Sequence, residues 1–312
     1  MAITSITAKL HRKLWALQSI EGGWGFQTTQ QAVEPSCLGI LALRHNRTPD
    51  VELALRSVEG RQNSDGSWPA STGDKPEGCW TTSLAVLTLI ATRGRNERVR
   101  LGTRWLLGAK GREANRFWRW KFQSVDKSVQ FDPRKYGWSW TSGTTSWVIP
   151  TAFSLIALRQ ANFRGFNQFP ELSERITNGT SMLFDRMCPN GGWNAGNGMA
   201  FGVRYSPYID ATAIALLALA GHENEPRVQT SLACLVKRLS GCPSPYSLAW
   251  GMLALAAYRN LTREAEKTLG RAVNELAALI ELGTGTDDAC TVAVCALALD
   301  AVEGDNVFEV RA

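Results

Sequence analysis

The sequence lacks long hydrophobic runs, since no stretch approaches the about eighteen consecutive apolar residues that a membrane-spanning helix needs. The first residues, MAITSITAKLHRKLWAL, have no apolar core of the signal-peptide type. No proline-rich or low-complexity linker interrupts the 312 residues, and we expect one domain over residues 1–312. These absences predict a soluble or membrane-peripheral protein.

Several chemical signatures are also missing. The sequence has no glycine-rich phosphate loop, no Ser-His-Asp ordering and no aspartate-rich metal motif, so magnesium-dependent ionisation is disfavoured. The seven cysteines are odd in number and lack paired metal spacing, which favours a reducing, cytoplasmic setting. The formal charge of +6 is modest and spread along the chain, and we expect no nucleic-acid partner.

What the sequence does contain is a short apolar pattern in six copies, each made of small and aliphatic residues without a charged face. Such a composition indicates a helix that is buried on every side. The copies read EPSCLGILAL from Glu34, WTTSLAVLTL from Trp80, IPTAFSLIAL from Ile149, DATAIALLAL from Asp210, YSLAWGMLAL from Tyr246 and CTVAVCALAL from Cys290.

Segments of the opposite character lie between these copies, for example residues 6–18, 51–62, 98–110 and 264–280. They carry charged residues on one face and Leu, Val or Trp on the other at helical spacing, which predicts half-solvated helices. Alternating amphipathic outer and apolar inner helices predict an all-α toroid, an (α/α)6 barrel of six helical hairpins around an apolar and aromatic cavity. The first residues of the copies should form a shared ring at one end of that cavity.

Three of the turns contain glycine shortly before tryptophan, in QSIEGGWG, QNSDGSWP and MCPNGGWN. In the first two, Gln18 and Gln62 precede a glycine by four residues and a tryptophan by six. The glycine is expected to end the outer helix with a positive φ, the tryptophan to fill the space between repeats, and the glutamine to bridge to backbone groups. We interpret this spacing as structural.

These turns, followed by apolar inner helices, resemble the repeats of the prenyltransferase and squalene cyclase superfamily over nearly the whole chain. The stretch PYIDATAIALLAL is similar to the catalytic helix of class II terpene cyclases, whose motif reads Asp-x-Asp-Asp followed by Thr-Ala. Asp210 falls on the middle aspartate, the proton donor of that family, and Thr212 and Ala213 also match. Tyr208 and Ala211 replace the two flanking aspartates, so the motif is degenerate.

The resemblance implies a protonation-initiated terpene or meroterpenoid cyclase acting on a polyprenyl substrate, with no cofactor and no metal. Asp210 would be the catalytic acid, although an aspartate before an apolar helix is also typical of a helix cap. A proton is present at rest only if desolvation raises the pKa of the carboxyl group more than the helix amino terminus lowers it. Glu34 and Asp288, at the starts of other copies, are alternative donors that also resemble caps.

Aromatic residues are available to stabilise carbocations, because the chain has 12 Trp, 11 Phe and 5 Tyr. Part of the long insertion at residues 115–153 is expected to fold over or into the cavity as a loop. Arg134, Lys135 and Arg204 are expected contacts for a lipid surface or an anionic head group. The candidate substrate-binding aromatic residues at or near the ring are Trp80, Trp147, Tyr205, Tyr208, Tyr246 and Trp250.

Two other classes of protein stay open. Asp288 and Cys290 have the spacing of the zinc ligands in protein prenyltransferase β subunits, but no histidine follows them. The three histidines, His11, His45 and His222, are expected to be solvated. The second of these classes is a non-catalytic toroid that binds an isoprenoid or a protein partner, since a fold does not establish a function.

Overall fold

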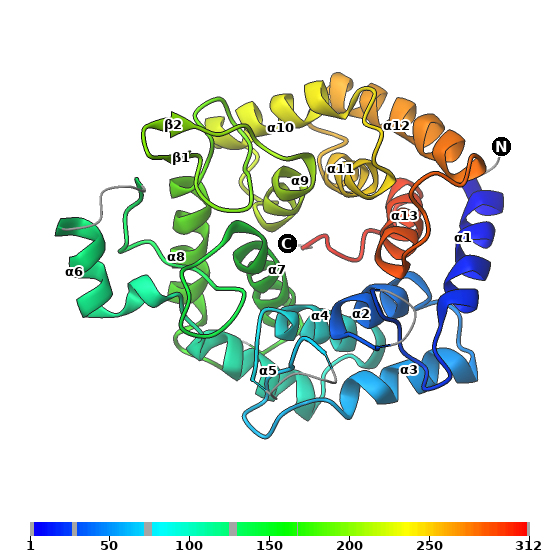
Figure 1. The fold of residues 1–312 in the computed structure, drawn as a ribbon, viewed down its shortest axis with the longest axis horizontal. Coiled ribbons are helices and arrows are strands. Elements are labelled where there is room, and N and C mark those ends of the chain that lie inside the picture. The colour runs from blue at the N-terminus through cyan, green and yellow to red at the C-terminus, as the bar shows by residue number, and fades with distance from the viewer. Residues whose placement is uncertain (1–2, 27–29, 72–76, 125–129, 167, 311–312) are drawn as a thin grey trace.

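The computed structural model describes residues 3–26, 30–71, 77–124, 130–166 and 168–310, and it is almost entirely helical. Six outer helices lie on the rim of a ring (Figure 1): α1 (Ile3–Leu17), α3 (Pro49–Glu59), α5 (Glu97–Gly108), α8 (Leu172–Asp185), α10 (Pro226–Leu239) and α12 (Arg263–Glu281). Six inner helices lie within it: α2 (Val33–Ala42), α4 (Thr81–Arg93), α7 (Val148–Phe163), α9 (Ile209–Ala218), α11 (Pro245–Ala257) and α13 (Ala289–Val302).

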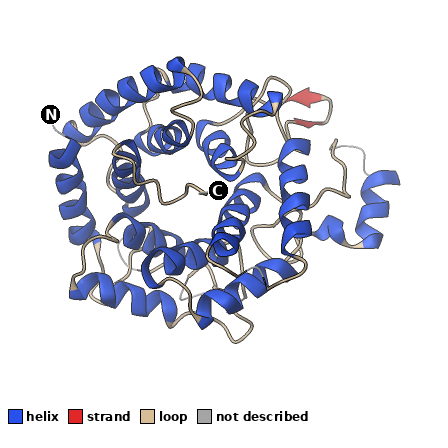
Figure 2. Ribbon diagram, turned by 180° about the vertical axis from the view of Figure 1, so that it is seen from behind, coloured by secondary structure: helices blue, strands red, loops and turns tan. Residues whose placement is uncertain are grey.

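The inner helices close into a ring. Each packs against the next along the chain, from α2 through α4, α7, α9 and α11 to α13, and α13 packs back against α2. Figure 2 shows the same double ring from behind. The predicted all-α toroid of six helical hairpins is therefore confirmed. None of the described helices is both long and apolar enough to cross a membrane.

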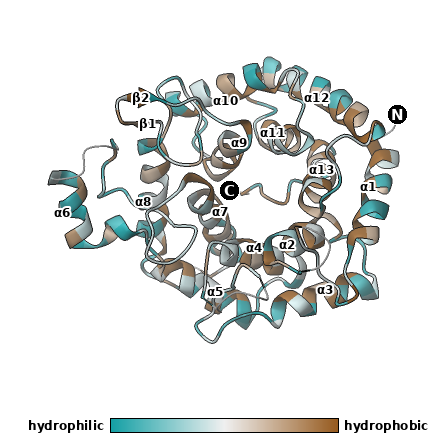
Figure 3. Ribbon diagram, in the orientation of Figure 1, coloured by the Kyte–Doolittle hydropathy of each residue, from teal (hydrophilic) through white to brown (hydrophobic). Residues whose placement is uncertain are grey.

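The burial of the two layers follows their composition. Every residue of α9 from Ala211 to Ala218 is buried, because its neighbours in the ring flank it on two sides and α10 covers it from outside. In α12, by contrast, the buried apolar residues recur every three or four positions, as one helical face requires. Figure 3 shows the mostly apolar inner layer against the mixed outer layer.

Consecutive inner helices begin side by side at one end of the ring, which we call the mouth. Backbone hydrogen bonds join the loops that precede neighbouring inner helices there. They run from Val33 N to Ala70 O (2.9 Å), from Trp80 N to Trp140 O (3.2 Å) and from Val148 N to Ala195 O (3.0 Å).

The glycine–tryptophan turns anchor outer helices to inner ones. The buried Trp24 donates its indole N–H to Leu14 O of α1, and its backbone N–H donates to Ser36 Oγ of α2. Gly22, two residues earlier, has a φ of 94°, as predicted. The Gln18 side chain donates to Gly22 O at 2.6 Å. The same pair of tryptophan bonds recurs at Trp68 with Thr82, Trp138 with Thr151 and Trp193 with Thr212.

The insertion after α5 has two parts. The 3₁₀ turn η1 (Arg112–Ala114) and helix α6 (Arg116–Ser124) lie outside the ring, and α6 projects away from it (Figure 1). The segment around Trp138 and Trp140 lies at the mouth, where Trp140 meets Trp80. A short hairpin, β1 (Met199–Ala200) antiparallel to β2 (Val203–Arg204), precedes α9.

The C-terminal segment after α13 enters the centre of the ring (Figure 1). It lies at the end opposite the mouth, because it meets Gln160 near the carboxyl end of α7. Asn306 donates its side-chain amide to Leu253 O at 3.0 Å, and Gln160 donates to Val307 O at 2.8 Å. Phe308 is completely buried. The repeat pattern does not predict this segment, which closes one end of the ring.

Candidate active site at the mouth of the ring

The two acids Glu34 and Asp210 occupy equivalent positions in different repeats. Each stands in the first turn of its inner helix, two residues before the Ser or Thr that binds the backbone N–H of the anchoring tryptophan. Trp80 and Ile149 hold this position in the second and third repeats. The repeat geometry therefore aims two carboxyl groups at the mouth from separate helices.

The structure brings the ring positions of distant repeats together. Burial, and next the negative charge of Asp288, raise the pKa of Glu34 to about 7. The charges of Glu34 and Asp210 both act on Tyr246, whose pKa is raised first by burial. Cys290 is also close to Glu34 and Asp288. A carboxyl group with a pKa near 7 holds its proton for much of the time at neutral pH.

The three acids differ in what their carboxyl groups do. Asp288 is an N-cap, because its carboxylate accepts the backbone N–H of Thr291 at 2.9 Å. Asp210 lies inside α9, where Tyr208 has the N-cap position, and its carboxyl group makes no hydrogen bond with any described residue. Glu34 likewise makes none within the described part of the chain, and is partly buried. Asp210 is therefore not the cap that its place in the sequence suggests.

An aromatic wall begins beside these acids and runs down to the C-terminal segment. Tyr246 and Trp250 lie one turn apart on α11, and Phe153 of α7 joins Trp250 to Trp80. The centroid separations are 5.0 Å for Trp80–Trp140, 5.8 Å for Trp80–Phe153, 5.6 Å for Phe153–Trp250, 6.2 Å for Tyr246–Trp250, 5.2 Å for Trp250–Phe308 and 6.1 Å for Phe153–Phe308.

One polar atom within this wall is unsatisfied. The indole N–H of Trp250 is buried without a geometrically acceptable hydrogen-bond partner in the described structure, although it lies near enough to the Tyr246 hydroxyl to affect its pKa. A buried unpaired donor costs about 1–3 kcal/mol. The wall thus holds an unpaired indole N–H beside the Tyr246 hydroxyl.

The other predicted aromatic residues lie outside the wall. Trp147 is half-buried at the N-cap of α7, against Gly196. Tyr205 and Tyr208 are 45% and 58% exposed, and Arg204 is exposed on β2. None of the three makes a ring or charge contact with the wall in the described structure. Their expected role in substrate binding stays a prediction.

Sequence reasoning missed Phe153, Trp140 and Phe308. Phe153 had a usable signal, because it stands four residues after the ring position Ile149, as Trp250 does after Tyr246. The fourth anchoring tryptophan, Trp138, directly follows Gly137, as Trp24 and Trp193 follow glycines in two of the three turns that were found. Phe308 lies beyond the last repeat, where the pattern gives no information.

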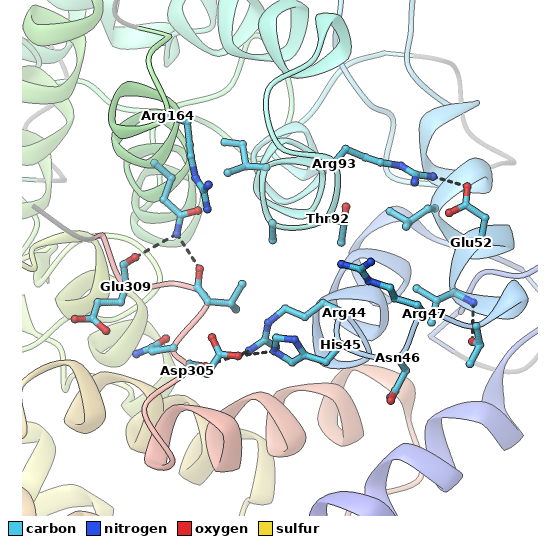
Figure 4. Close-up of a pocket in the computed structure, with 18 of the residues that line it drawn as sticks. Arg44, His45, Asn46, Arg47, Glu52, Thr92, Arg93, Arg164, Asp305 and Glu309 are labelled. Atoms are coloured by element: carbon cyan, nitrogen blue, oxygen red, sulfur yellow. Dashed lines mark hydrogen bonds and ion pairs between the residues drawn. The ribbon is translucent and has the colours of Figure 1, made fainter.

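Hollows lie near the mouth and at the opposite end. A cavity of about 360 Å³ lies between Trp80, Trp105 and Trp138, and one of about 660 Å³ lies beside Asp288 and Gln31. The largest, of about 1250 Å³, lies at the carboxyl ends of α2, α4 and α7 (Figure 4).

Several charges at the largest cavity are paired, whereas Arg47 and Arg164, which also line it, form no ion pair with a described residue. Arg44 forms ion pairs with Asp300 at 3.1 Å and with Asp305, and Arg93 pairs with Glu52 at 2.5 Å. Such a lining suits a polar ligand better than a hydrocarbon chain. For an apolar ligand, the better candidate is the mouth, where Trp80 at the start of the aromatic wall lines the cavity of about 360 Å³.

A zinc site at Asp288 and Cys290 has no third ligand. Among the described residues, no three His, Cys, Asp or Glu side chains are placed to hold a metal ion. Burial raises the pKa of the Cys290 thiol, which opposes the thiolate form that zinc binds. His45 is exposed, as expected, and binds Asp305 at 2.5 Å at the opposite end. His11 and His222, however, are partly buried rather than solvated, because they pack beside Asn46 and Phe184.

No family model and no curated protein matches the chain in sequence. Solved structures do resemble it in fold. The type II terpene cyclase MstE from Scytonema, in complex with geranylgeranyl dihydroxybenzoate, matches with a TM-score of 0.62 at 14% identity, over 96% of this chain and 97% of that chain. ent-Copalyl diphosphate synthase from Streptomyces platensis matches with a TM-score of 0.55 at 18% identity, over 86% and 50%.

Enzymes of a different chemistry match equally well. An alpha-amylase from Clostridium perfringens has a TM-score of 0.65 at 10% identity, over 95% of this chain and 97% of that chain. At such identities the similarity shows the fold alone, the all-α toroid that terpene cyclases and glycosidases share.

Proposed function

We propose that the chain is a terpene or meroterpenoid cyclase of the class II type, which starts cyclisation of a polyprenyl substrate by protonating an alkene. The observation that carries the proposal is a partly buried carboxyl group, Glu34, with a raised pKa next to a continuous aromatic wall. This reaction needs an acid that is protonated at rest, together with ring faces for the cation.

The first step breaks the O–H bond of the carboxyl group and forms a C–H bond at the terminal alkene carbon. The electron pair of that alkene makes the new C–H bond, and a tertiary cation remains. Each further alkene then attacks the cation and forms a ring bond, while the faces of the partly exposed Trp80 and Tyr246 stabilise the moving charge by up to about 2 kcal/mol each. Loss of a proton to water or a basic group ends the sequence, so the overall reaction is an isomerisation.

Two residues are candidates for the acid. Glu34 is favoured because burial and Asp288 keep it protonated, whereas Asp210 is the residue that aligns with the donor of class II cyclases. Asp210 lacks the flanking aspartates of that motif, and its carboxyl group forms no hydrogen bond within the described structure. We therefore assign the proton to Glu34 first and to Asp210 second.

The test is product analysis by mass spectrometry with farnesyl, geranylgeranyl and prenylated aromatic compounds. The parent chain should give cyclised isomers, and Glu34→Gln should lower the rate by about 10²–10⁴-fold, the usual contribution of a general acid. Asp210→Asn is run in parallel, with Asp287→Asn as the matched control, because that acid is highly exposed near the same mouth. A larger loss in Asp210→Asn than in Glu34→Gln would reverse our assignment.

The alternative of a non-catalytic isoprenoid-binding or protein-interaction toroid predicts a different result. Saturable binding of a prenylated compound with no product at any pH would contradict the cyclase and support a binding protein. A prenyltransferase-like reaction would need a zinc site that the described residues around Asp288 and Cys290 do not provide.

A further inference from the structure

Helix α6 carries exposed aromatic side chains away from the ring. Phe117 is 61% exposed and Trp120 is 56% exposed, and their ring centroids are 6.1 Å apart because they are three residues apart on one helical face. No residue of α6 is buried, and its principal contact with another element is with η1. Figure 1 shows the helix standing off the rim.

The opposite side of α6 fixes it to the body. Trp118 stacks under the guanidinium of Arg112 at 4.6 Å, and Phe122 packs against Phe131 at 5.2 Å. The exposure of Phe117 and Trp120 is therefore a consequence of how the helix is attached.

Basic residues surround the two exposed rings. The helix sequence RFWRWKFQS contains Arg116, Arg119 and Lys121 and no acidic residue. No ion pair within the described residues involves these three cations. Arg116 is exposed, whereas Arg119 and Lys121 are half-buried: Arg119 donates to Ala114 O at 3.2 Å, and the Lys121 ammonium lies 4.7 Å from the centre of the Trp118 ring. By contrast, the cations expected to meet a lipid surface are partly neutralised, since Arg134 pairs with Asp132 at 3.0 Å and Lys135 with Asp185 at 3.5 Å.

A second exposed apolar feature lies at the same side of the ring. Phe201 and Val203 of the β1–β2 hairpin are 75% and 55% exposed, and Arg204 beside them is exposed as well. Figures 1 and 2 both show the hairpin and α6 on this side of the molecule.

We propose that α6 docks the protein on an anionic lipid bilayer, with Phe117 and Trp120 inserted at the level of the head groups, Arg116 contacting lipid phosphates, and Arg119 and Lys121 adding positive charge beside them. Aromatic side chains flanked by basic ones are the combination that an anionic interface binds. The net positive charge of the helix, without a carboxylate, favours this partner over a neutral apolar protein surface. The proposal does not depend on the cyclase activity.

The experiment is co-sedimentation of the full chain with vesicles of phosphatidylcholine alone and of phosphatidylcholine mixed with phosphatidylglycerol. The parent should bind the mixed vesicles, and binding should weaken as salt is raised. Phe117→Ser with Trp120→Ser should weaken binding about tenfold or more, because the inserted apolar area is lost. Arg116→Ala and Lys121→Ala should each weaken it roughly fivefold.

The matched control is Ile20→Ser with Leu282→Ser, which removes two residues that are 97% and 78% exposed elsewhere on the molecule. This control should bind as the parent does. Thermal unfolding of all variants identifies any that fail to fold. If the aromatic variant does not fold, the vesicle binding of the charge variants tests the proposal. Equal binding to both kinds of vesicle, no binding by the parent, or unchanged binding by the aromatic variant would overturn the proposal.

Discussion

Phe308 of the C-terminal segment packs against Trp250 of α11, with ring centroids 5.2 Å apart and planes inclined by 47°. Its neighbours in sequence, Val307 and Glu309, line the large polar cavity on the other side. The segment is thus a partition. It separates the aromatic wall, which begins at the acids of the mouth, from a cavity lined by charged and polar residues.

Phe308→Ala should join the two compartments. Removal of a buried phenyl group should lower the free energy of unfolding by about 3–5 kcal/mol, which chemical denaturation measures. If the proposed cyclase activity holds, the variant should also accept a longer prenyl chain than the parent. Phe308→Leu is the control, since it keeps most of the volume. Stability equal to that of the parent would mean that the partition is not packed as described.

The raised pKa of Glu34 makes stability depend on pH. The folded pKa, about 7, lies above the ordinary value of 4.5, so the protonated group favours folding at low pH. This contribution should be lost as the pH rises from about 4.5 through 7, and its full size is at most about 3 kcal/mol. Urea unfolding across this range should show a flatter profile for Glu34→Gln than for the parent. Identical slopes would contradict the burial of the group.

The same shift predicts the pH dependence of catalysis. If Glu34 donates the proton, the rate should be constant at low pH and fall about tenfold per unit above a pKa near 7. Asp288→Asn removes the charge that contributes to the shift, so the break in the pH–rate profile should move to lower pH. A profile without a break between about pH 5 and 9 would exclude Glu34 as the acid.

The fold was predictable because the residue pattern of each repeat indicates the helices that this repeat forms. The apolar copies specify inner helices and the amphipathic segments specify outer ones, and α9 and α12 show these two patterns in their burial. The shared ring at the mouth followed from helix direction alone. The pKa of Glu34 did not, because it depends first on burial and next on Asp288, which is 254 positions away in the chain and adjacent only once the ring closes.

Local motif matching was less informative than the repeat. Thr212 matches the threonine of a catalytic motif, yet Thr82 and Thr151 make the same hydrogen bonds in repeats that have no acid at the ring position. Its match is therefore explained by packing. The C-terminal segment and the exposed helix α6 have no counterpart in the repeat and could not be placed from it.

Buried Glu113 anchors the base of α6, which gives a further prediction. Its carboxylate accepts the backbone N–H of Ser146 at 3.2 Å and faces Arg186 at 3.7 Å, and both side chains are almost fully buried. Glu113→Gln leaves Arg186 with only Asp185 as a charged partner at short range, and should destabilise the chain by about 3 kcal/mol. Thermal unfolding checks this. The exposed Glu97→Gln, which loses only a surface pair with Arg100, should leave the unfolding temperature almost unchanged.

Thr212→Val tests whether the threonine of the degenerate motif is structural or catalytic. The hydroxyl oxygen accepts the Trp193 N–H at 2.9 Å and the hydroxyl donates to Trp193 O at 3.1 Å, so valine leaves a buried donor and acceptor unpaired. We expect a loss of about 1–3 kcal/mol in the free energy of unfolding. Thr82→Val, which removes the equivalent bond to Trp68 in a repeat without an acid, should cost a similar amount. If Thr212→Val instead abolished turnover while leaving stability unchanged, the motif would act in catalysis and the packing explanation would be wrong.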